Sequence, residues 1–140
     1  MSSKKGFTLL EVLIVVIIIG ILASLALPNY ITSLEKARSG EAVTNVGSIK
    51  NAIDRYWYEN GNIQTAAGAT ITTANLDVTI TSTLYAYVIT DDETDADTLV
   101  YTITATRNVG ATAYTVTWIQ ESATEGHLYR SLNLGGPVAP

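Results

Sequence analysis

GFTLLEVLIVVIIIGILASLALP, residues 6–28, is the stretch that decides the fold of this 140-residue chain. Apart from Glu11, nearly every side chain from Phe7 to Leu27 is apolar. About 21 residues rising 1.5 Å each make a helix of about 31 Å, which is long enough to cross the hydrocarbon core of a bilayer. Lys4 and Lys5 precede this run, and no comparable basic cluster follows it closely. The positive-inside rule therefore places the N-terminus in the cytoplasm.

Glu11 is the exception within the apolar run. A charged side chain at the centre of a bilayer costs roughly 2.5–3.5 kcal/mol, so an acid in a membrane segment is a functional candidate that needs a cationic partner. Removal of the run as an ordinary secretory signal, at Ala23 or Ala26, is a weaker alternative, because such signals have shorter apolar stretches.

The composition argues against several kinds of chemistry. The chain has no cysteine, so disulfides, thiolate catalysis and cysteine metal sites are impossible. Its net charge of −5 leaves no basic stripe for phosphates, and we expect no specific nucleic acid binding. The sequence holds no nucleophile elbow and no phosphate-binding loop, and its single histidine, His127, has no obvious catalytic company. We therefore expect no enzymatic activity and no cofactor.

The segment Gly6-Phe7-Thr8-Leu9-Leu10-Glu11 follows a short basic leader and precedes about twenty apolar residues that end at Pro28. Over roughly residues 4–60, this arrangement resembles the signal and helix of type IV pilins and their relatives. The resemblance implies that a membrane-embedded prepilin peptidase cuts after Gly6 and methylates the new terminus, so that Phe7 becomes N-methylphenylalanine. It also implies four parts: a cleaved cytoplasmic leader (1–6), a transmembrane and filament-core helix (7–28), the amphipathic half of the same helix (29–60) and a globular β-sheet head (61–140).

Cleavage would supply the cation that Glu11 needs. It frees an α-ammonium group on Phe7, and methylation preserves the charge. The Phe7 amine lies one helical turn from Glu11 in its own chain, where the helix dipole also favours an acid. The resemblance instead favours a pair between Glu11 and the amine of the next subunit. Such a heterologous contact builds an open helical filament.

Gly20 and Pro28 weaken the apolar helix. Pro28 lacks the N–H that a helix needs, and glycine costs helix stability through its backbone freedom. A simple kink is one interpretation. The resemblance implies a second, in which residues 20–28 loosen into extended chain when subunits assemble.

From Asn29 to Asn60 the apolar residues recur at helical spacing, and Lys50 and Asp54 form an i,i+4 pair of opposite charge. Gly61 is a good C-terminal stop signal. We predict one helix from about Phe7 to Asn60, whose second half packs on the domain that follows.

The remaining sequence alternates polar residues, mostly threonine, with apolar ones. This period of two predicts four half-buried strands, at residues 69–82, 83–90, 98–106 and 113–120. The short polar gaps between them suit an antiparallel meander. The predicted fold class is α+β. The arrangement resembles the type IV pilin fold, which implies that the apolar half of a long N-terminal helix protrudes and that the amphipathic half packs on an antiparallel β-meander.

The fragment YTVTWIQ, residues 114–120, resembles the tryptophan-containing last strand of many type IVa pilins. Those proteins usually carry a cysteine two residues after the tryptophan, bridged to another near the C-terminus. Gln120 occupies that position here. The C-terminal loop, about residues 121–140, must therefore be held by packing, hydrogen bonds or an ion.

Acidic residues gather between two of the predicted strands, at Asp91, Asp92, Glu93, Asp95 and Asp97. Alternating carboxylates can supply oxygens to Ca²⁺, but the EF-hand pattern fails, because the sixth position is not glycine and Thr102 stands in place of the closing glutamate. A solvated hairpin loop is the favoured interpretation. In the alternative, Asp91, Glu93, Asp95 and Asp97 are the candidate calcium ligands.

Three functions compete. The leading hypothesis is a structural subunit, a pilin, of an extracellular type IV pilus that supports adhesion, twitching motility or DNA uptake. It implies identical subunits, the prepilin peptidase, an assembly platform and a cytoplasmic assembly ATPase as partners, and the inner membrane as the location before assembly. The alternative is a pseudopilin of a type II secretion system, which shares the whole N-terminal argument. The third is a single-pass membrane-anchored enzyme or binding module with an uncut N-terminus.

Overall fold

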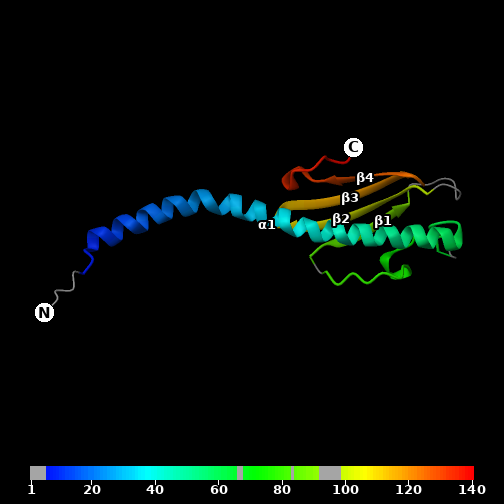
Figure 1. The fold of residues 1–140 in the computed structure, drawn as a ribbon, viewed down its shortest axis with the longest axis horizontal. Coiled ribbons are helices and arrows are strands. Elements are labelled where there is room, and N and C mark those ends of the chain that lie inside the picture. Colours follow the sequence, from blue (N-terminus) through cyan, green and yellow to red (C-terminus); the bar gives the residue numbers. More distant parts are fainter. Residues whose placement is uncertain (1–5, 66–67, 83, 92–98) are drawn as a thin grey trace. The chain divides into compact units, whose positions relative to one another are not determined.

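The computed structural model describes residues 6–65, 68–82, 84–91 and 99–140 (Figure 1). The chain forms two compact units, Met1–Glu35 and Lys36–Pro140. One helix, α1 (Leu9–Asn60), extends through both units. The second unit also contains four strands and two short 3₁₀ helices: β1 (Ala86–Asp91), β2 (Tyr101–Val109), β3 (Thr112–Ser122), β4 (Glu125–Arg130), η1 (Thr73–Asn75) and η2 (Leu132–Leu134).

The ends of α1 follow from local chemistry. The helix begins at Leu9, two residues later than predicted, because the Thr8 hydroxyl accepts a hydrogen bond from the backbone N–H of Glu11 as an N-cap. It ends at Asn60, as predicted, because Gly61 adopts a left-handed conformation with φ of +73°. The Gly61 N–H then donates to the carbonyl of Trp57 at 2.7 Å and satisfies one of the terminal carbonyls.

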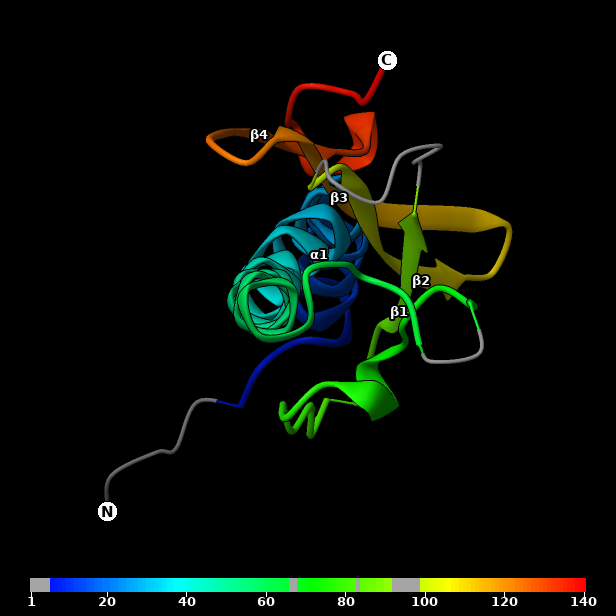
Figure 2. The same ribbon diagram turned by 90° about the vertical axis from the view of Figure 1, so that its right-hand side faces the viewer.

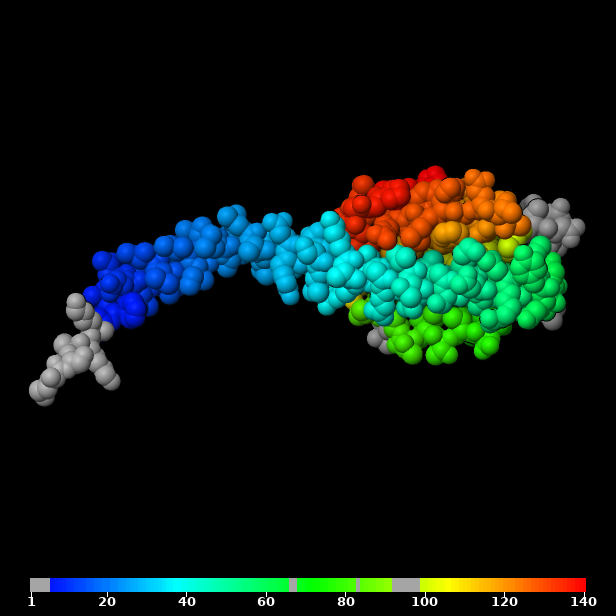
Figure 3. All heavy atoms as spheres, in the orientation of Figure 1, coloured from blue at the N-terminus to red at the C-terminus, as the bar shows by residue number. Residues whose placement is uncertain are grey.

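In the second unit, α1 buries one stripe of side chains against the sheet. Ala42, Val46, Ile49 and Ile53 follow the i, i+4, i+7, i+11 spacing of one helical face, and all four are essentially inaccessible to solvent. The rest of the second unit completes the same core from the chain before β1, the sheet and its connections, and η2. These core residues are Ile63, Ile71, Leu76, Tyr85, Ile89, Leu99, Tyr101, Ile103, Ala105, Val116 and Leu134. Figure 3 shows this part of α1 between the chain that precedes β1 and the C-terminal region.

The four strands form one antiparallel sheet in the order β1-β2-β3-β4, which is the predicted meander (Figure 2). Burial alternates along β2, where Tyr101, Ile103 and Ala105 are buried and the threonines between them are half-exposed. The alternation arises because successive side chains of a strand point to opposite faces, and α1 covers one face. The predicted α+β fold, a long N-terminal helix followed by an antiparallel sheet, is confirmed.

The predicted strand at residues 69–82 is wrong. This segment contains η1 and a single isolated bridge between Gln64 and Thr70, and it pairs with none of the four strands. Ile71 and Leu76 are nevertheless buried in the core. The segment pairs locally with the chain just before it, since the Ile71 N–H donates to the Ile63 carbonyl at 3.2 Å and the Thr65 N–H donates to the Ala69 carbonyl at 2.8 Å. It joins no strand of the four-stranded sheet.

The prediction of a C-terminal loop from about residue 121 is also wrong in part. Residues 125–130 form β4, which pairs with β3, so the tryptophan-containing strand is not the last one. The Trp118 indole occupies the space above Gly126, where an added Cβ would lie 2.5 Å from the ring. The large ring compensates for the missing side chain in β4.

Hydrogen bonds and packing hold the chain after β4. The Arg130 N–H donates to the Pro137 carbonyl at 2.7 Å, and the Ser131 N–H donates to the Thr115 carbonyl at 2.9 Å. Leu134 is buried in the core. Packing and hydrogen bonds, two of the three possibilities that the sequence left open, therefore hold this segment.

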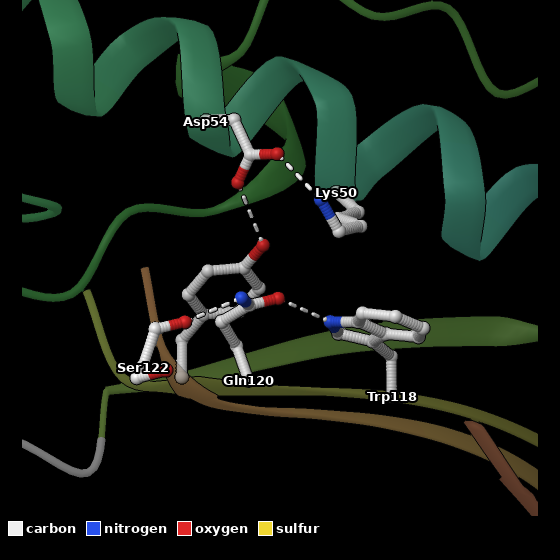
Figure 4. Close-up of polar contacts among 6 residues, drawn as sticks. Lys50, Asp54, Trp118, Gln120 and Ser122 are labelled. Carbon is white, nitrogen blue, oxygen red and sulfur yellow. Dashed lines mark hydrogen bonds and ion pairs between the residues drawn. The ribbon is translucent and has the colours of Figure 1, made fainter. Parts of the chain in front are cut away.

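Gln120, at the position of the missing cysteine, is buried and hydrogen-bonded (Figure 4). Its Oε1 accepts from the Trp118 indole N–H at 2.9 Å, and its Nε2 donates to the Ser122 carbonyl at 2.6 Å. A buried amide is tolerated when both of its ends are satisfied. Gln120 therefore fixes the Trp118 ring within the face that meets α1.

A second polar cluster joins α1 to the sheet (Figure 4). The predicted Lys50–Asp54 pair is confirmed at 2.6 Å, and the Tyr101 hydroxyl donates to Asp54 Oδ1 at 3.1 Å. The Lys50 ammonium also lies 5.6 Å from the centroid of the Trp118 ring, within cation–π range. Burial, reinforced by the Asp54 carboxylate, raises the pKa of Tyr101 far above its usual value, so its hydroxyl remains a donor at neutral pH.

Candidate functional site

The N-terminus of α1 holds Glu11 in a capping box with Thr8. The backbone N–H of Thr8 donates to Glu11 Oε2 at 2.7 Å, and the Thr8 hydroxyl donates to the same oxygen at 2.8 Å. In return the Glu11 N–H donates to the Thr8 hydroxyl at 3.2 Å. The signal was present in the sequence, because a threonine three residues before a glutamate at the start of an apolar run is the pattern of this motif. The sequence analysis missed it.

The capping box uses one carboxylate oxygen of Glu11. Within the part of the chain that the structure describes, Oε1 accepts no hydrogen bond. Glu11 also lines a hollow of about 330 Å³ on the helix surface, with Phe7, Val12, Val15 and Val16. A carboxylate therefore stands at the edge of an otherwise apolar depression.

The first unit is covered with exposed apolar side chains. Phe7 is 88 % exposed, and the large apolar side chains from Leu9 to Ile31 are exposed as well. Among the described residues, α1 is the one helix that is long and apolar enough to cross a membrane. An apolar surface of this extent is unfavourable in water, so it must be covered by lipid or by other apolar helices.

Gly20 and Pro28 both lie inside α1, which stays α-helical across them. Pro28 cannot donate to the carbonyl of Ser24, so the helix lacks one backbone hydrogen bond there. An added Cβ at Gly20 would meet nothing within 4 Å, so packing in this chain does not explain the glycine. Gly6 lies just before the capped turn, and its surroundings are equally open.

The predicted calcium ligands Glu93, Asp95 and Asp97 lie outside the described residues. Asp91, at the end of β1, accepts a hydrogen bond from Gln64 Nε2 at 3.2 Å. The calcium alternative therefore stays a prediction.

His127 lies near two acidic side chains, which the sequence analysis did not predict. Its imidazole lies 3.6 Å from the carboxylate of Glu125, and Glu121 is the third member of the group. The β3–β4 pairing, which the sequence analysis did not predict, brings the three together.

Comparison with known proteins identifies the N-terminal segment. A family model described as "Prokaryotic N-terminal methylation motif" matches residues 1–27, a range that contains Gly6, Phe7 and Glu11. No solved structure matches the chain significantly.

Similar proteins belong to two kinds of assembly. The type II secretion system core protein G of Vibrio cholerae is 48 % identical over 60 residues, which is 43 % of this chain and 41 % of that protein. The protein of the same description from Escherichia coli is 44 % identical over 64 residues, or 46 % of this chain and 44 % of that protein. Fimbrial protein Q of Moraxella bovis is 36 % identical over 81 residues, or 58 % of this chain and 52 % of that protein.

The fold and the motif together define a chain with an apolar N-terminal helix, a prepilin-type methylation signal and a β-sheet head. The resemblance to the type IV pilin family, to which secretion pseudopilins are related, is thereby confirmed. The chain spans about half or less of the length of these relatives. The activity of the whole protein is therefore a matter for proposal.

Proposed function

We propose that this chain is a structural subunit that is cleaved after Gly6, N-methylated at Phe7 and polymerised through α1 into a filament. It has no enzymatic role in this proposal. The observation that carries it is the environment of Glu11, a carboxylate beside an apolar hollow in the part of α1 whose large apolar side chains are exposed.

The geometry of Glu11 favours a cation from another chain. Oε2 already accepts two hydrogen bonds from Thr8, which fix the carboxylate against its own helix end. Oε1 is left as the acceptor for a methylated ammonium group. A neighbour's Phe7 that approaches this oxygen would also bring its apolar ring to the hollow lined by Val12, Val15 and Val16.

The apolar surface of the first unit must be covered both before and after assembly. Before assembly the inner membrane covers it, with the leader on the cytoplasmic side where the prepilin peptidase acts. In the filament, the same surface packs on identical helices. Transfer from lipid to helix neighbours changes the apolar burial little, so the energy for extraction comes from a cytoplasmic assembly ATPase acting through a membrane platform.

Loosening of residues 20–28 belongs to the same proposal. Because Pro28 has no N–H, the helix already lacks the hydrogen bond to the Ser24 carbonyl. Gly20, one turn before Ser24, has the greatest backbone freedom of any residue type. Extended chain in this region would lengthen the subunit and adjust the stagger between neighbours.

Two kinds of filament fit these observations. An extracellular type IV pilus, which would serve adhesion, twitching motility or DNA uptake, is favoured by the similarity to a fimbrial protein over 58 % of the chain. A short pseudopilus of a type II secretion system is favoured by the higher identity, 48 % and 44 %, to two secretion core proteins. The third candidate, a membrane-anchored binding module, finds less support, because it leaves the methylation motif without a role.

Mass spectrometry of the mature N-terminus tests the proposal. We expect a chain that begins with N-methylphenylalanine at Phe7 and lacks the first six residues. An intact N-terminus in the native assembly would overturn the proposal and support the binding module. Electron microscopy of filaments sheared from the cell surface, compared with the periplasmic fraction, then separates a pilus from a secretion pseudopilus.

A further inference from the structure

The β3–β4 hairpin carries a group of side chains on its solvent face. Ile119 pairs with His127, and the neighbouring pair is Gln120 and Gly126. Gln120 is buried on the face that meets α1, so His127 lies on the opposite face, where its side chain is 51 % exposed. Successive residues of a strand alternate between faces, which separates this group from the core.

An irregularity in the pairing brings Glu121 into the same group. Gln120 pairs with Gly126 and Ser122 pairs with Glu125, so Glu121 is an extra residue in β3, as in a β-bulge. Bulges redirect side chains and tighten the local twist. The Ser122 hydroxyl also accepts from the N–H of Glu125 at 3.1 Å, which fixes the turn that carries the second carboxylate.

The result is a compact group of three donors. One ligand atom from each of Glu121, Glu125 and His127 lies within 4.8 Å of the others, and His127 Nε2 lies 3.6 Å from Glu125 Oε1. Bonds of 2.0–2.2 Å in a tetrahedral shell place neighbouring ligands about 3.3 Å apart. Because all three side chains are exposed, rotations of their outer bonds close the remaining distance without moving the strands.

We propose that Glu121, Glu125 and His127 form a binding site for a divalent first-row transition ion of the Zn²⁺ class. Imidazole is a good ligand for zinc, nickel and copper, whereas Ca²⁺ and Mg²⁺ take oxygen ligands almost exclusively. Two carboxylates balance the charge of the ion. Three protein ligands leave at least one position open to water or to a group from a neighbouring molecule.

This site is independent of the filament proposal and of the calcium ligands predicted around Asp91. It uses different residues and a different class of ion. An ion pair between His127 and Glu125 alone is the competing explanation of their 3.6 Å contact. That explanation gives Glu121 no role, so Glu121 separates the two.

Titration with ZnCl₂ by isothermal calorimetry, on the purified full chain in detergent micelles, tests the site. We expect saturable binding of a single Zn²⁺ with a dissociation constant in the micromolar range. Loss of groups that merely support a metal ligand costs about 10–100-fold in affinity, so Glu121→Gln, Glu125→Gln and His127→Asn should each weaken binding at least about tenfold. Glu59→Gln, which removes an exposed carboxylate of α1, is the matched control and should bind as the wild type does.

Electron paramagnetic resonance with Cu²⁺ supplies a second measurement. A spectrum with nitrogen coupling from one imidazole is expected in the wild type and in Glu59→Gln, and its absence in His127→Asn. The absence of saturable Zn²⁺ binding in the wild type would overturn the proposal. So would any of the three ligand variants that loses less than about tenfold in affinity, since the ion would then be held by other groups.

Discussion

Gly126 has no room for a side chain beside Trp118 and Gln120. A Cβ added there would lie 2.5 Å from the Trp118 ring and 2.8 Å from Gln120 Oε1. Gly126→Ala therefore forces the indole out of its place and breaks its hydrogen bond to Gln120. We expect a loss of about 1–3 kcal/mol in the free energy of unfolding. Thermal unfolding followed by near-ultraviolet circular dichroism reports it, because Trp118 itself gives the signal.

Gly40→Ala is the matched control for that experiment. Gly40 lies inside α1, where an added Cβ meets nothing within 4 Å. The same substitution should there stabilise the protein by about 0.5–1 kcal/mol, because alanine loses less backbone freedom in a helix. Equal stability changes for the two variants would contradict the packing argument.

Tyr101 couples stability to alkaline pH. Its hydroxyl donates to Asp54, and burial together with this carboxylate raises the pKa of Tyr101. Tyr101→Phe should cost about 1.5 kcal/mol at pH 8, the lower end for hydrogen bonds to charged groups, because solvent reaches Asp54. Above the unfolded-state pKa of about 10, the unfolded chain alone releases this proton, so the wild type loses up to about 1.4 kcal/mol per pH unit.

Tyr101→Phe has no hydroxyl proton to release, so its stability does not fall with pH for this reason. The advantage of the wild type over Tyr101→Phe is fully present below pH about 10 and should vanish near pH 11. Urea unfolding of both chains at pH 8, 10 and 11 measures it. A difference in stability that does not change with pH would show that the hydroxyl contributes only by packing.

Residue-level chemistry was readable from the sequence where it is local. The Lys50–Asp54 pair and the helix stop at Gly61 depend on spacings of a few residues. The capping box of Thr8 and Glu11 was equally local and could have been predicted. The group of Glu121, Glu125 and His127 could not, because it depends on strand pairing and on an extra residue in β3.

At the level of elements, periodicity predicted burial better than pairing. The apolar residues Ile71 and Leu76 in residues 69–82 are buried, yet no strand of the sheet pairs there. In β4 the pairing is present but the pattern is absent. Gly126 and the charged residues interrupt the alternation of polar and apolar residues, yet every residue of β4 pairs with β3. A period of two shows that a chain is extended and half-covered, whereas its hydrogen-bond partner depends on the whole fold.

The outer edge of β4 depends on the C-terminal segment. The Arg130 N–H points away from β3 to the Pro137 carbonyl, and this contact covers one donor of an edge strand. Truncation after Gly136 should lower the protection of the Arg130 amide from hydrogen exchange by at least about tenfold. The Ser131 amide, which donates to the Thr115 carbonyl of β3, is the internal control and should keep its protection. Equal loss at both amides would indicate general unfolding.

For the whole molecule, the filament proposal depends on the charge of Glu11 and not on its capping role. Glu11→Gln keeps an oxygen that accepts from Thr8 but removes the charge that would attract a neighbour's ammonium group. Thr8→Ala removes the capping hydroxyl and leaves the carboxylate. The two variants therefore separate helix capping from intersubunit pairing.

With each variant as the sole subunit, we expect Glu11→Gln to insert in the membrane and to be cleaved at a near-normal rate, but to form few filaments. Thr8→Ala should assemble close to normally, and Glu11→Ala, which loses both roles, should assemble as poorly as Glu11→Gln. Immunoblots measure cleavage, and electron microscopy counts the filaments. Normal filaments from Glu11→Gln would end the electrostatic account, because an amide cannot neutralise the N-terminal ammonium group of the next subunit.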